Sequence, residues 1–438
     1  MILKTMPIPA LAAASACLFL SFARAAVPSP DPDPLDEVVI SATLRSTALE
    51  ALPASATVLD ARTLARAGVE HFGDVLGLVP NLNWAGGTSR PRYFQLRGIG
   101  ELEQYEGAPN PSVGFLIDDI DFSGVAMPAT LFDTAKIEVL RGPQGTAYGA
   151  NALAGLISLT TQAPRDEFEL RAAADLGDYG VRGGGLVLND SMVSGQAAYR
   201  LVAHVYRGDG FRRDAFLGRD DTNGFDENLL RGKLRWQLGS DLKLDLTAMF
   251  TDIDNGYDAW SIDNSRVTQS DKPGRDMQRT RALAARFEYD RFDAATLRST
   301  TSFADSHILY SYDGDWGNDA FWGVNAPYDF TERILRDRRS VSEELRVISK
   351  SPDARLRWVG GIMYKNSEIE ETGVAAGVLG HPALGVAWLA NKLGQHGVPL
   401  EPGHLVLAGS FTRVVFAHKG DTLHADFGPL GGVAVQFV

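Results

Sequence analysis

Residues 141–155 read RGPQGTAYGANALAG, a run in which glycine recurs at positions 142, 145, 149 and 155. Glycine adopts backbone conformations with positive φ that other residues resist, so we expect tight turns here. The spacing resembles a phosphate-binding loop only superficially, because no Lys-Ser or Lys-Thr pair follows the glycines. The sequence therefore predicts a structural role for this run and argues against nucleotide binding.

Short strands and short helices flank this run, from residue 51 to residue 164. Asp60 stands where an N-cap is expected before a helix over residues 61–67, and Gly68 stands where that helix should stop. Apolar residues at helical spacing between 72 and 79 predict a second helix, which Pro80 ends. Residues with strand character occupy 55–59, 93–98, 113–119, 137–141 and 157–161. This mixture predicts a compact α+β domain.

Beyond residue 165 the pattern changes to an alternation of apolar and polar residues. Residues 230–238 and 242–250 alternate in this way, and Gly239 and Ser240 join them as a tight hairpin. Seven further strands are predicted, at residues 168–176, 181–189, 196–206, 281–289, 294–303, 341–349 and 356–364. Strands of about ten residues with one apolar face are typical of transmembrane β-barrels. The alternation alone leaves a soluble β-sandwich open as an alternative.

Residues 1–25 have the three parts of a secretory signal peptide. Lys4 supplies the positive start, residues 8–22 form the apolar stretch, and residues 23–25 read ARA, a cleavage site of the small-x-small form. Cys17 is the only cysteine of the 438 residues, so neither a disulfide framework nor a cysteine-based zinc site is expected. The formal net charge of −13 argues against a general nucleic-acid binder, which needs a basic face.

A proline-rich linker with a short strand-like tag fills residues 26–50. Prolines at 28, 30, 32 and 34 predict an extended segment. Residues 35–42 then read LDEVVISA, in which β-branched residues after an acidic pair favour a strand. At the end of a flexible leader, such a tag can pair with the sheet edge of a partner. The alternative is an edge strand of the following domain.

Together these segments resemble the TonB-dependent outer-membrane receptors of Gram-negative bacteria, over about residues 36–364. The resemblance identifies the tag as the TonB box, the partner-binding segment, formed by Asp36, Glu37, Val38, Val39, Ile40, Ser41 and Ala42. It identifies residues 51–164 as the plug domain. The structural residues of the plug motif are then Arg97, Gly98, Glu138, Arg141, Gly142, Pro143, Gly145, Tyr148, Gly149, Asn151 and Gly155. The end of the plug departs from the family pattern at Leu156 and Ser158.

This resemblance implies active uptake of a scarce nutrient, such as a ferric siderophore, across the cell outer membrane. The implied partners are the periplasmic TonB protein, outer-membrane lipid and the small ligand, without nucleic acid. No catalytic residue, cofactor or metal site is predicted, so we expect a protein that is not an enzyme. A passive porin-like channel is an alternative, but a porin needs neither a plug nor a TonB box.

The strand count suggests an incomplete barrel. About nine strands are predicted before residue 364, whereas plugged outer-membrane barrels have about 22. At about ten residues each, 22 strands need about 220 residues before any loop is added. We therefore expect an incomplete antiparallel transmembrane β-barrel over residues 165–365. Its long polar stretches, residues 208–228 and 253–279, are predicted to be extracellular loops.

The composition changes again in the tail. Six of the 67 residues from Thr372 to Val438 are charged, and residues 382–393 predict an apolar helix that ends near Gly394. Residues 371–382, 387–393, 407–413 and 419–431 resemble the C-terminal part of 2-keto-4-pentenoate and 2-oxohept-3-enedioate hydratases. These enzymes hold a divalent metal through acidic residues placed earlier in their own chain. We therefore expect residues 366–438 to be a hydratase-like α/β fragment of a chimera, without hydratase activity; an active 2-oxo-alkenoate hydratase is the alternative.

Overall fold

The structure is a computed structural model that describes residues 39–40, 47–48, 54–85, 90–102, 111–125, 130–144, 152–323, 330–350, 356–373, 382–401, 419–420, 422–426 and 432–436. The chain divides into two units, Met1–Val38 and Val39–Val438, and all the described residues belong to the second. The predicted signal peptide, residues 1–25, and the prolines of the predicted linker therefore lie outside the described residues.

The predicted plug domain, called the plug below, is built on a five-stranded sheet. Its strands lie in the order β3 (Ser55–Asp60), β8 (Thr134–Arg141), β9 (Gly155–Thr161), β6 (Val113–Ile117) and β7 (Ile120–Asp121). β6 and β9 are parallel, and the other neighbouring pairs are antiparallel. The remaining elements are α1 (Ala61–Ala67), α2 (Phe72–Val75), the 3-10 helix η2 (Leu76–Leu78) and the hairpin of β4 (Leu82–Ala85) with β5 (Tyr93–Leu96). The predicted α+β class is confirmed.

Local chemistry defines the helices of the plug. The Asp60 carboxylate accepts a hydrogen bond from the Thr63 backbone N–H at 2.7 Å, as an N-cap does. Gly68 ends α1 in the left-handed conformation, with φ of 63°. The second helical stretch, α2 with η2, stops two residues before Pro80. Both predicted helices are confirmed.

Aromatic rings hold the plug elements together. Phe72 from α2, Phe94 from β5 and Phe115 from β6 are buried, and their ring centroids lie 5.3–5.4 Å apart. Phe72 meets both other rings edge to face, and Phe94 and Phe115 stack. This cluster ties a helix, a hairpin and the sheet into one core.

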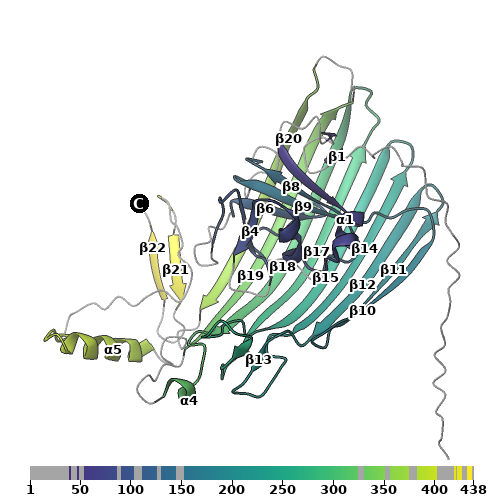
Figure 1. Ribbon diagram of the computed structural model, residues 1–438. Coiled ribbons are helices and arrows are strands. Elements are labelled where there is room, and N and C mark those ends of the chain that lie inside the picture. Colours follow the sequence, from purple (N-terminus) through teal and green to yellow (C-terminus); the bar gives the residue numbers. More distant parts are fainter. Residues whose placement is uncertain are drawn as a thin grey trace, which may run out of the picture. The chain divides into compact units, whose positions relative to one another are not determined.

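A second, larger sheet follows the plug. Its nine strands are antiparallel neighbours in chain order, namely β10 (Glu169–Leu176), β11 (Arg182–Val193), β12 (Ala197–Gly208), β14 (Phe225–Leu238), β15 (Leu242–Tyr257), β17 (Gly274–Tyr289), β18 (Ala295–Asp313), β19 (Thr331–Ser349) and β20 (Val359–Gly373). In the part of the chain that the structure describes, β10 and β20 are its two edges, so the sheet is open. Figure 1 shows the plug elements against one face of this sheet.

The connections of the large sheet differ at its two ends. At one end they are short, as at Gly239, where φ is 74° between β14 and β15. At the other end, the connection between β10 and β11 is also short, but the three later connections are longer and carry β13 (Arg213–Asp214), β16 (Val267–Thr268) and α4 (Asp319–Trp322). Short turns at one end and long loops at the other are typical of outer-membrane barrels.

The strands extend further toward the long connections than the sequence predicts. β14 begins at Phe225, β15 ends at Tyr257 and β17 begins at Gly274, so the predicted loops 208–228 and 253–279 are too long. The outward-facing side chains of β15 change from apolar to acidic at Asp252. The apolar alternation stops there, and the predicted strand therefore ended at residue 250. In the structure Asp252 instead lies 3.2 Å from Arg279 on β17, and this ion pair bridges the two strands.

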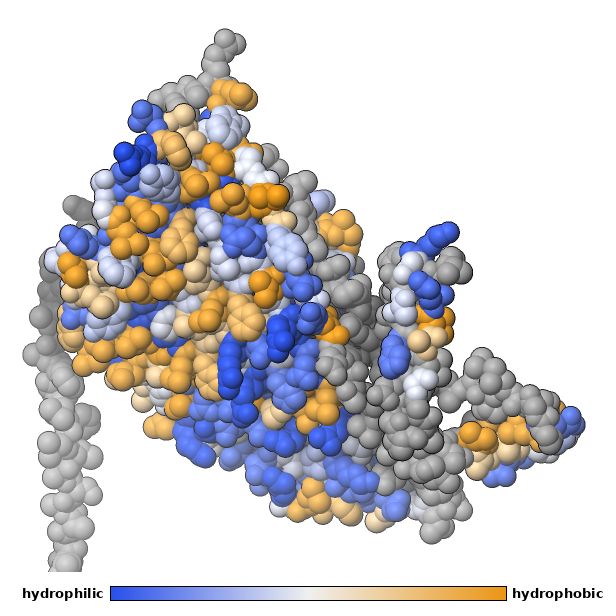
Figure 2. All heavy atoms as spheres, turned by 180° about the vertical axis from the view of Figure 1, so that it is seen from behind, coloured by the Kyte–Doolittle hydropathy of each residue, from blue (hydrophilic) through white to orange (hydrophobic). Residues whose placement is uncertain are grey.

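The two faces of the large sheet have opposite character. Leu201, Leu230 and Leu283 on the outward face remain about half exposed, and Figure 2 shows an apolar region on this side with a hydrophilic region below it. The inward face carries polar residues that are buried, such as Arg200 and Thr251. The predicted arrangement, apolar outward and polar inward, is confirmed.

The tail keeps its predicted helix and adds strands. α5 (Pro382–Gly394) lies where the sequence predicts it. β20 continues to Gly373, across the predicted start of the tail at residue 366. β21 (Thr422–Asp426) and β22 (Gly432–Gln436) pair as an antiparallel hairpin, which the sequence did not indicate. Across the residues that the structure describes, no helix is both long enough and apolar enough to cross a membrane.

Candidate functional site: the plug–sheet interface

The candidate site is the interface between the plug and the inward face of the large sheet. Strand alternation builds it, because every second side chain of β14 points to the plug. Arg231 is buried there, while its neighbour Leu230 faces outward and is 53% exposed. The plug meets these inward side chains with loops and strand ends that carry the opposite charge.

Asp133, in the loop before β8, is the centre of the largest charge cluster. Arg200 on β12 donates to both of its carboxylate oxygens, at 2.6 and 2.8 Å. Arg171 on β10 donates at 2.6 Å, and Arg231 on β14 lies 3.6 Å away. Asp133 has φ of 62°, a conformation that aspartate tolerates better than most residues. One plug carboxylate thus contacts three strands of the sheet.

Asp118 and Asp121, at either side of the turn between β6 and β7, make the second group of contacts. Lys233 on β14 lies 3.2 Å from Asp118, and Arg338 on β19 donates to Asp121 at 3.2 Å. Lys365 on β20 also contacts Asp121. Both carboxylates are almost fully buried.

These surroundings lower the pKa of both carboxyls. Burial alone raises the pKa of Asp118, but the charges of Lys233 and Arg231 and the hydrogen bonds from Thr161 outweigh it. Burial likewise raises the pKa of Asp121, and Arg338 with Lys365 outweighs it. Both carboxyls are therefore held in the charged form, which favours docking of the plug.

In a third contact the plug supplies the cation and the large sheet supplies the carboxylate. Arg90 of the plug donates to both carboxylate oxygens of Asp276 on β17, at 2.8 and 3.2 Å, and to Gln278 at 2.9 Å. Arg92 lies 3.5 Å from the same Asp276. All four side chains are buried. Bidentate arginine–carboxylate pairs are among the stronger and more directional polar contacts in proteins.

Two histidines and several carboxylates form a further group near α2. His71 Nε2 lies 2.9 Å from Glu227 Oε2 on β14, and Asn255 donates to Glu227 Oε1 at 2.8 Å. Burial lowers the pKa of His71, but Glu227 and the neighbouring acids outweigh it and raise the pKa overall. Burial raises the pKa of Glu70 to about 7. His204 on β12 lies beside Glu70, with 3.6 Å between Nε2 and Oε1.

Apolar side chains also cross the interface. The buried core of the plug is continuous with inward residues of β14, β15, β17 and β18, namely Leu229, Met249, Ile253, Ala282, Ala284, Ala304 and Ile308. The plug is therefore docked by a mixture of apolar packing and buried ion pairs.

Three of the predicted motif residues, Arg141, Glu138 and Gly155, make close contacts inside the plug. Arg141 donates to Thr57 Oγ1 and to the Pro80 carbonyl, both at 2.9 Å. Lys136 Nζ donates to Glu138 at 3.0 Å. A Cβ on Gly155 would lie 2.4 Å from the Leu140 carbonyl oxygen, so only glycine fits there.

Three further motif residues form turns. Arg97 and Gly98 follow β5 with φ of 55° and 79°, and Gly142 follows β8 with φ of 98°. Pro143 comes directly after Gly142, outside the strands. The motif residues Gly145, Tyr148, Gly149 and Asn151 lie outside the described residues.

Only the centre of the predicted TonB box is described. Val39 and Ile40 form β1 (Val39–Ile40), which pairs antiparallel with β2 (Thr47–Ala48). These two residues therefore have strand backbone. The rest of the box lies outside the described residues, namely Asp36, Glu37, Val38, Ser41 and Ala42.

The residues that dock the plug were not among those predicted from the sequence. The predicted candidates within the plug were motif residues, whereas the docking charges are Asp118, Asp121, Asp133 and Arg90. The signal available was the alternation of β14, which predicts that Arg231 and Lys233 face inward. An inward charge needs a partner, but the pattern does not say which plug residue provides it.

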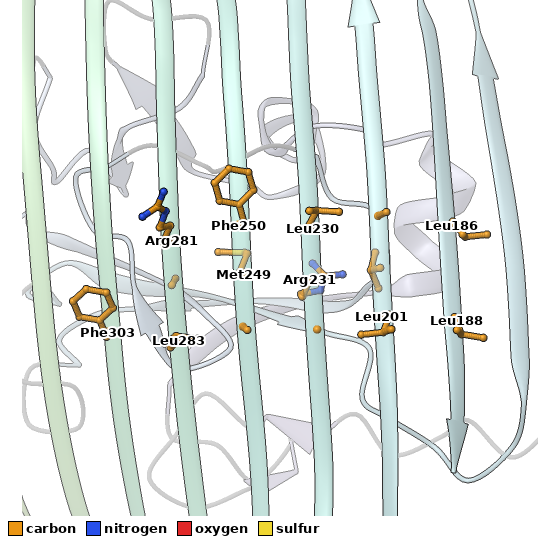
Figure 3. A pocket seen from close by; sticks show the side chains of 15 residues that line it. Leu186, Leu188, Leu201, Leu230, Arg231, Met249, Phe250, Arg281, Leu283 and Phe303 are labelled. Atoms are coloured by element: carbon orange, nitrogen blue, oxygen red, sulfur yellow. The ribbon is translucent and has the colours of Figure 1, made fainter. Parts of the chain in front are cut away.

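A depression of about 640 Å³ lies on the outward face of the sheet (Figure 3). Leu186, Leu201, Leu230, Phe250 and Leu283 surround it on five neighbouring strands. Small residues at its floor, such as Gly232, leave the space between these side chains. Its exposed lining is mainly apolar, although Arg231 and Arg281 also border it, and we do not take it as the functional site.

Comparison with a protein-family model identifies the plug. Residues 48–156 match the family model described as TonB-dependent Receptor Plug Domain. This confirms the predicted resemblance for the N-terminal part of the chain. Members of the TonB-dependent receptor family are outer-membrane proteins of Gram-negative bacteria, which is the predicted location.

Known receptors resemble the chain beyond the plug. The pesticin receptor of Yersinia pestis is 32% identical over 128 residues, which are 29% of this chain and 19% of that receptor. The crystal structure of the ferric yersiniabactin uptake receptor FyuA from Yersinia pestis superposes with a TM-score of 0.62 at 19% identity, and the match covers 73% of this chain and 49% of that chain. At that identity the likeness shows the fold, a plug against a barrel-type sheet.

A different family resembles the C-terminal part. The 2-oxo-hept-4-ene-1,7-dioate hydratase of Escherichia coli is 58% identical over 89 residues, which are 20% of this chain and 33% of the enzyme. The predicted resemblance of the tail to such hydratases is confirmed. The chain spans about a third or less of the length of these curated relatives.

Proposed function

We propose that this chain works as a TonB-dependent outer-membrane receptor, in which the plug and the nine-stranded sheet take up a scarce nutrient such as a ferric siderophore. The plug-domain match and the fold of the ferric yersiniabactin uptake receptor support this proposal. Uptake then needs no covalent chemistry, because ligand binding and the pull of a partner shift the plug between docked and displaced states. We accordingly propose that the chain is not an enzyme.

The docked plug is the observation that carries this proposal. Asp133, Asp121 and Arg90 hold the plug to strands from both halves of the sheet through ion pairs. Water can replace each of these partners when the plug moves, since both members of a pair are well hydrated once separated. A plug held in this way closes the inner side of the sheet and can still be released by force.

We propose that force enters through the TonB box. β1 is already a strand, and it pairs with β2 through one edge. The periplasmic TonB protein would add a strand to β1 by β-augmentation, either at the other edge or in place of β2. A pull along the leader would then be transmitted to β3 and the plug.

Capture of the periplasmic TonB domain tests this function. The mature chain in outer-membrane vesicles is incubated with the immobilised domain, and Val39→Pro is compared with Val39→Thr. Proline removes a ladder N–H, so we expect it to reduce capture at least about tenfold. Threonine keeps the N–H and the β-branched shape, so capture should remain. Equal capture of both variants would count against strand pairing at the TonB box.

The outward face of the sheet supports insertion into the outer membrane. Apolar outward residues of β15 run from Leu242 to Phe250, about 27 Å along a strand at about 3.4 Å per residue. At the strand tilt of about 35–45° found in outer-membrane barrels, this run rises about 19–22 Å, which is most of their apolar band of about 25 Å. We propose that outer-membrane lipid covers this band and the depression within it.

Hydratase activity is a second candidate, because the C-terminal part is 58% identical to a hydratase over 89 residues. We propose instead that the chain is a fusion product in which this part has no hydratase activity, since the match covers a third of the enzyme. A hydration assay with a 2-oxo-alkenoate and added Mg²⁺ should stay blank. Turnover by the full chain would overturn this assignment. Sequencing of the locus with long reads tests the fusion, which an uninterrupted receptor frame would refute.

A further inference from the structure

Three potential metal ligands from separate elements meet at the edge of the plug–sheet interface. Glu70 lies between α1 and α2 of the plug, Asp175 is on β10 and His204 is on β12. One ligand atom of each lies within 4.8 Å of those of the other two. His204 Nε2 is 3.6 Å from Glu70 Oε1 and 3.9 Å from Asp175 Oδ2.

Two of these atoms are buried without a hydrogen-bond partner among the described residues. They are His204 Nε2 and Glu70 Oε1, and they face each other. The His204 side chain is 1% exposed. A buried polar atom that is left unpaired costs about 1–3 kcal/mol. Two such atoms that converge on one point indicate that a group between them satisfies both.

The other side of the His204 ring is already positioned. Thr130 Oγ1 lies 2.9 Å from Nδ1, and the Phe132 ring stacks on the imidazole at 4.6 Å between centroids. When Nδ1–H donates to the threonine hydroxyl, Nε2 carries the free lone pair. Metal-binding histidines are typically oriented by such a bond from their second ring nitrogen.

We propose that Glu70, Asp175 and His204 bind one divalent transition-metal ion of the Zn²⁺ class, which joins the plug to β10 and β12. One imidazole and two carboxylates are a donor set that suits zinc, whereas Ca²⁺ needs six to eight oxygens. A tetrahedral zinc site with bonds of about 2.0–2.1 Å places ligand atoms about 3.3 Å apart. The carboxylates are 34% and 44% exposed, so they can close the remaining distance. Water would supply the fourth ligand from the open side.

This site is separate from the uptake function proposed above, because it needs only the docked plug and two strands. The three ligands are far apart along the chain, so the sequence alone does not indicate this site. A bound ion would add a link between Glu70 and the sheet beside the charge cluster of Asp133. The plug would therefore be harder to displace with the metal than without it.

Titration of the metal-free full chain with Co²⁺ and then Zn²⁺ tests the proposal. The protein is purified in detergent without a histidine tag and stripped with a chelator. We expect one equivalent of Co²⁺ to give a visible d–d absorption spectrum, which one equivalent of Zn²⁺ displaces. His204→Gln and Asp175→Ala should each weaken Co²⁺ binding at least about 100-fold. Thr130→Val, which removes the orienting hydroxyl, should weaken it about 10–100-fold.

His307→Gln is the matched control, because His307 also lies on the large sheet beside a carboxylate, Asp337. It should leave the Co²⁺ titration unchanged. Asp175 is half exposed on an edge strand, so its variant tests the site even if His204→Gln fails to fold. No stoichiometric Co²⁺ spectrum in the wild-type chain would overturn the proposal and leave a shared proton between Glu70 and His204. Equal binding by Asp175→Ala and His307→Gln would overturn it as well.

Discussion

Arg200 on β12 donates two hydrogen bonds to the Asp133 carboxylate of the plug, from Nη2 to Oδ1 at 2.6 Å and from Nε to Oδ2 at 2.8 Å. The arginine side chain is 1% exposed and the aspartate is fully buried. A buried ion pair of this kind stabilises a fold little more than a well-packed apolar pair would. Removing only one of its two partners, however, is strongly destabilising. Docking of the plug therefore depends on keeping both partners.

Loss of the Asp133 charge should destabilise the docked plug strongly. Asp133→Asn keeps a residue that tolerates positive φ but leaves the buried Arg200 with only the partly exposed Glu169 as a carboxylate partner. We therefore expect the free energy of unfolding to fall by up to about 3–5 kcal/mol. Urea unfolding in detergent, followed by tryptophan fluorescence, measures this change. Arg339→Met is the control, because its ion pair with Asp305 is exposed and should matter little. Similar shifts in both variants would contradict the assigned role of Asp133.

Gly155→Ala should destabilise the plug through crowding. The added Cβ would lie 2.4 Å from both the Leu140 carbonyl oxygen and Leu96 Cδ1, so backbone must move, and we expect a loss of about 1–3 kcal/mol. The urea midpoint of the plug measures it. Gly73→Ala has no atom within 4 Å of the new Cβ and lies in α2, so it should be neutral or slightly stabilising. Equal urea midpoints for Gly155→Ala and Gly73→Ala would contradict the crowding of a side chain at residue 155.

Acid should release the plug through Asp118 and Asp121, whose pKa values are lowered by Lys233 and Arg338. A carboxyl whose pKa is lower in the folded protein stabilises the fold at pH values above its unfolded pKa of about 3.9. This stabilisation is lost as the pH falls through the folded pKa. We therefore expect the contribution of these two carboxyls to be constant near pH 7, and the urea midpoint to fall below about pH 4 as that contribution is lost.

The Asp118→Asn variant isolates this effect. It removes one of the two titrating groups, so its stability should depend less steeply on pH below about 4 than that of the wild type. Asp220→Asn, in an exposed loop position, controls for the loss of a surface charge. Parallel wild-type and Asp118→Asn curves would mean that other groups govern the acid response.

A charge on the outward face should hinder insertion. Leu283→Arg places a cation in the apolar band, and an arginine near the bilayer midplane costs about 2–4 kcal/mol. We expect a lower fraction of the chain in the outer-membrane pellet and a lower urea midpoint in lipid vesicles. His307→Arg lies on the same face beside Asp337, outside the apolar band, and should insert normally. Equal insertion of the two variants would argue against a lipid-covered band.

Local chemistry made much of the fold predictable. Asp60 and Gly68 define both ends of α1 because a cap and a left-handed glycine act within one turn. The period of two in β14 and β15 gave the strands and their inward and outward faces, since alternation follows from backbone geometry. It failed at Asp252, where an ion pair with Arg279 on the next strand replaces the apolar contact.

The site was far less predictable, because its contacts join distant parts of the chain. Asp133 and Arg200 are 67 residues apart, and Arg90 and Asp276 are 186 residues apart. The strand pattern places Arg200 on the inward face, whereas Asp276 fell in the predicted loop 253–279 and joins β17 only in the structure. For both residues the partner depends on how the plug docks. The hairpin of β21 and β22 was not predicted for another reason. Each strand has five residues, and so short a stretch does not show a recognisable alternation.

Spin labelling along β14 tests most directly whether the plug docks on the inner face of a membrane-spanning sheet. Single cysteines at residues 229–236 in a Cys17→Ser background are labelled in lipid vesicles, and their accessibility to oxygen and to a water-soluble nickel complex is measured. Even positions, such as Leu230 and Leu234, should be accessible to oxygen from the lipid. Odd positions, such as Arg231 and Lys233, should be shielded from both reagents by the plug. Uniform accessibility to the nickel complex along the strand would contradict the account.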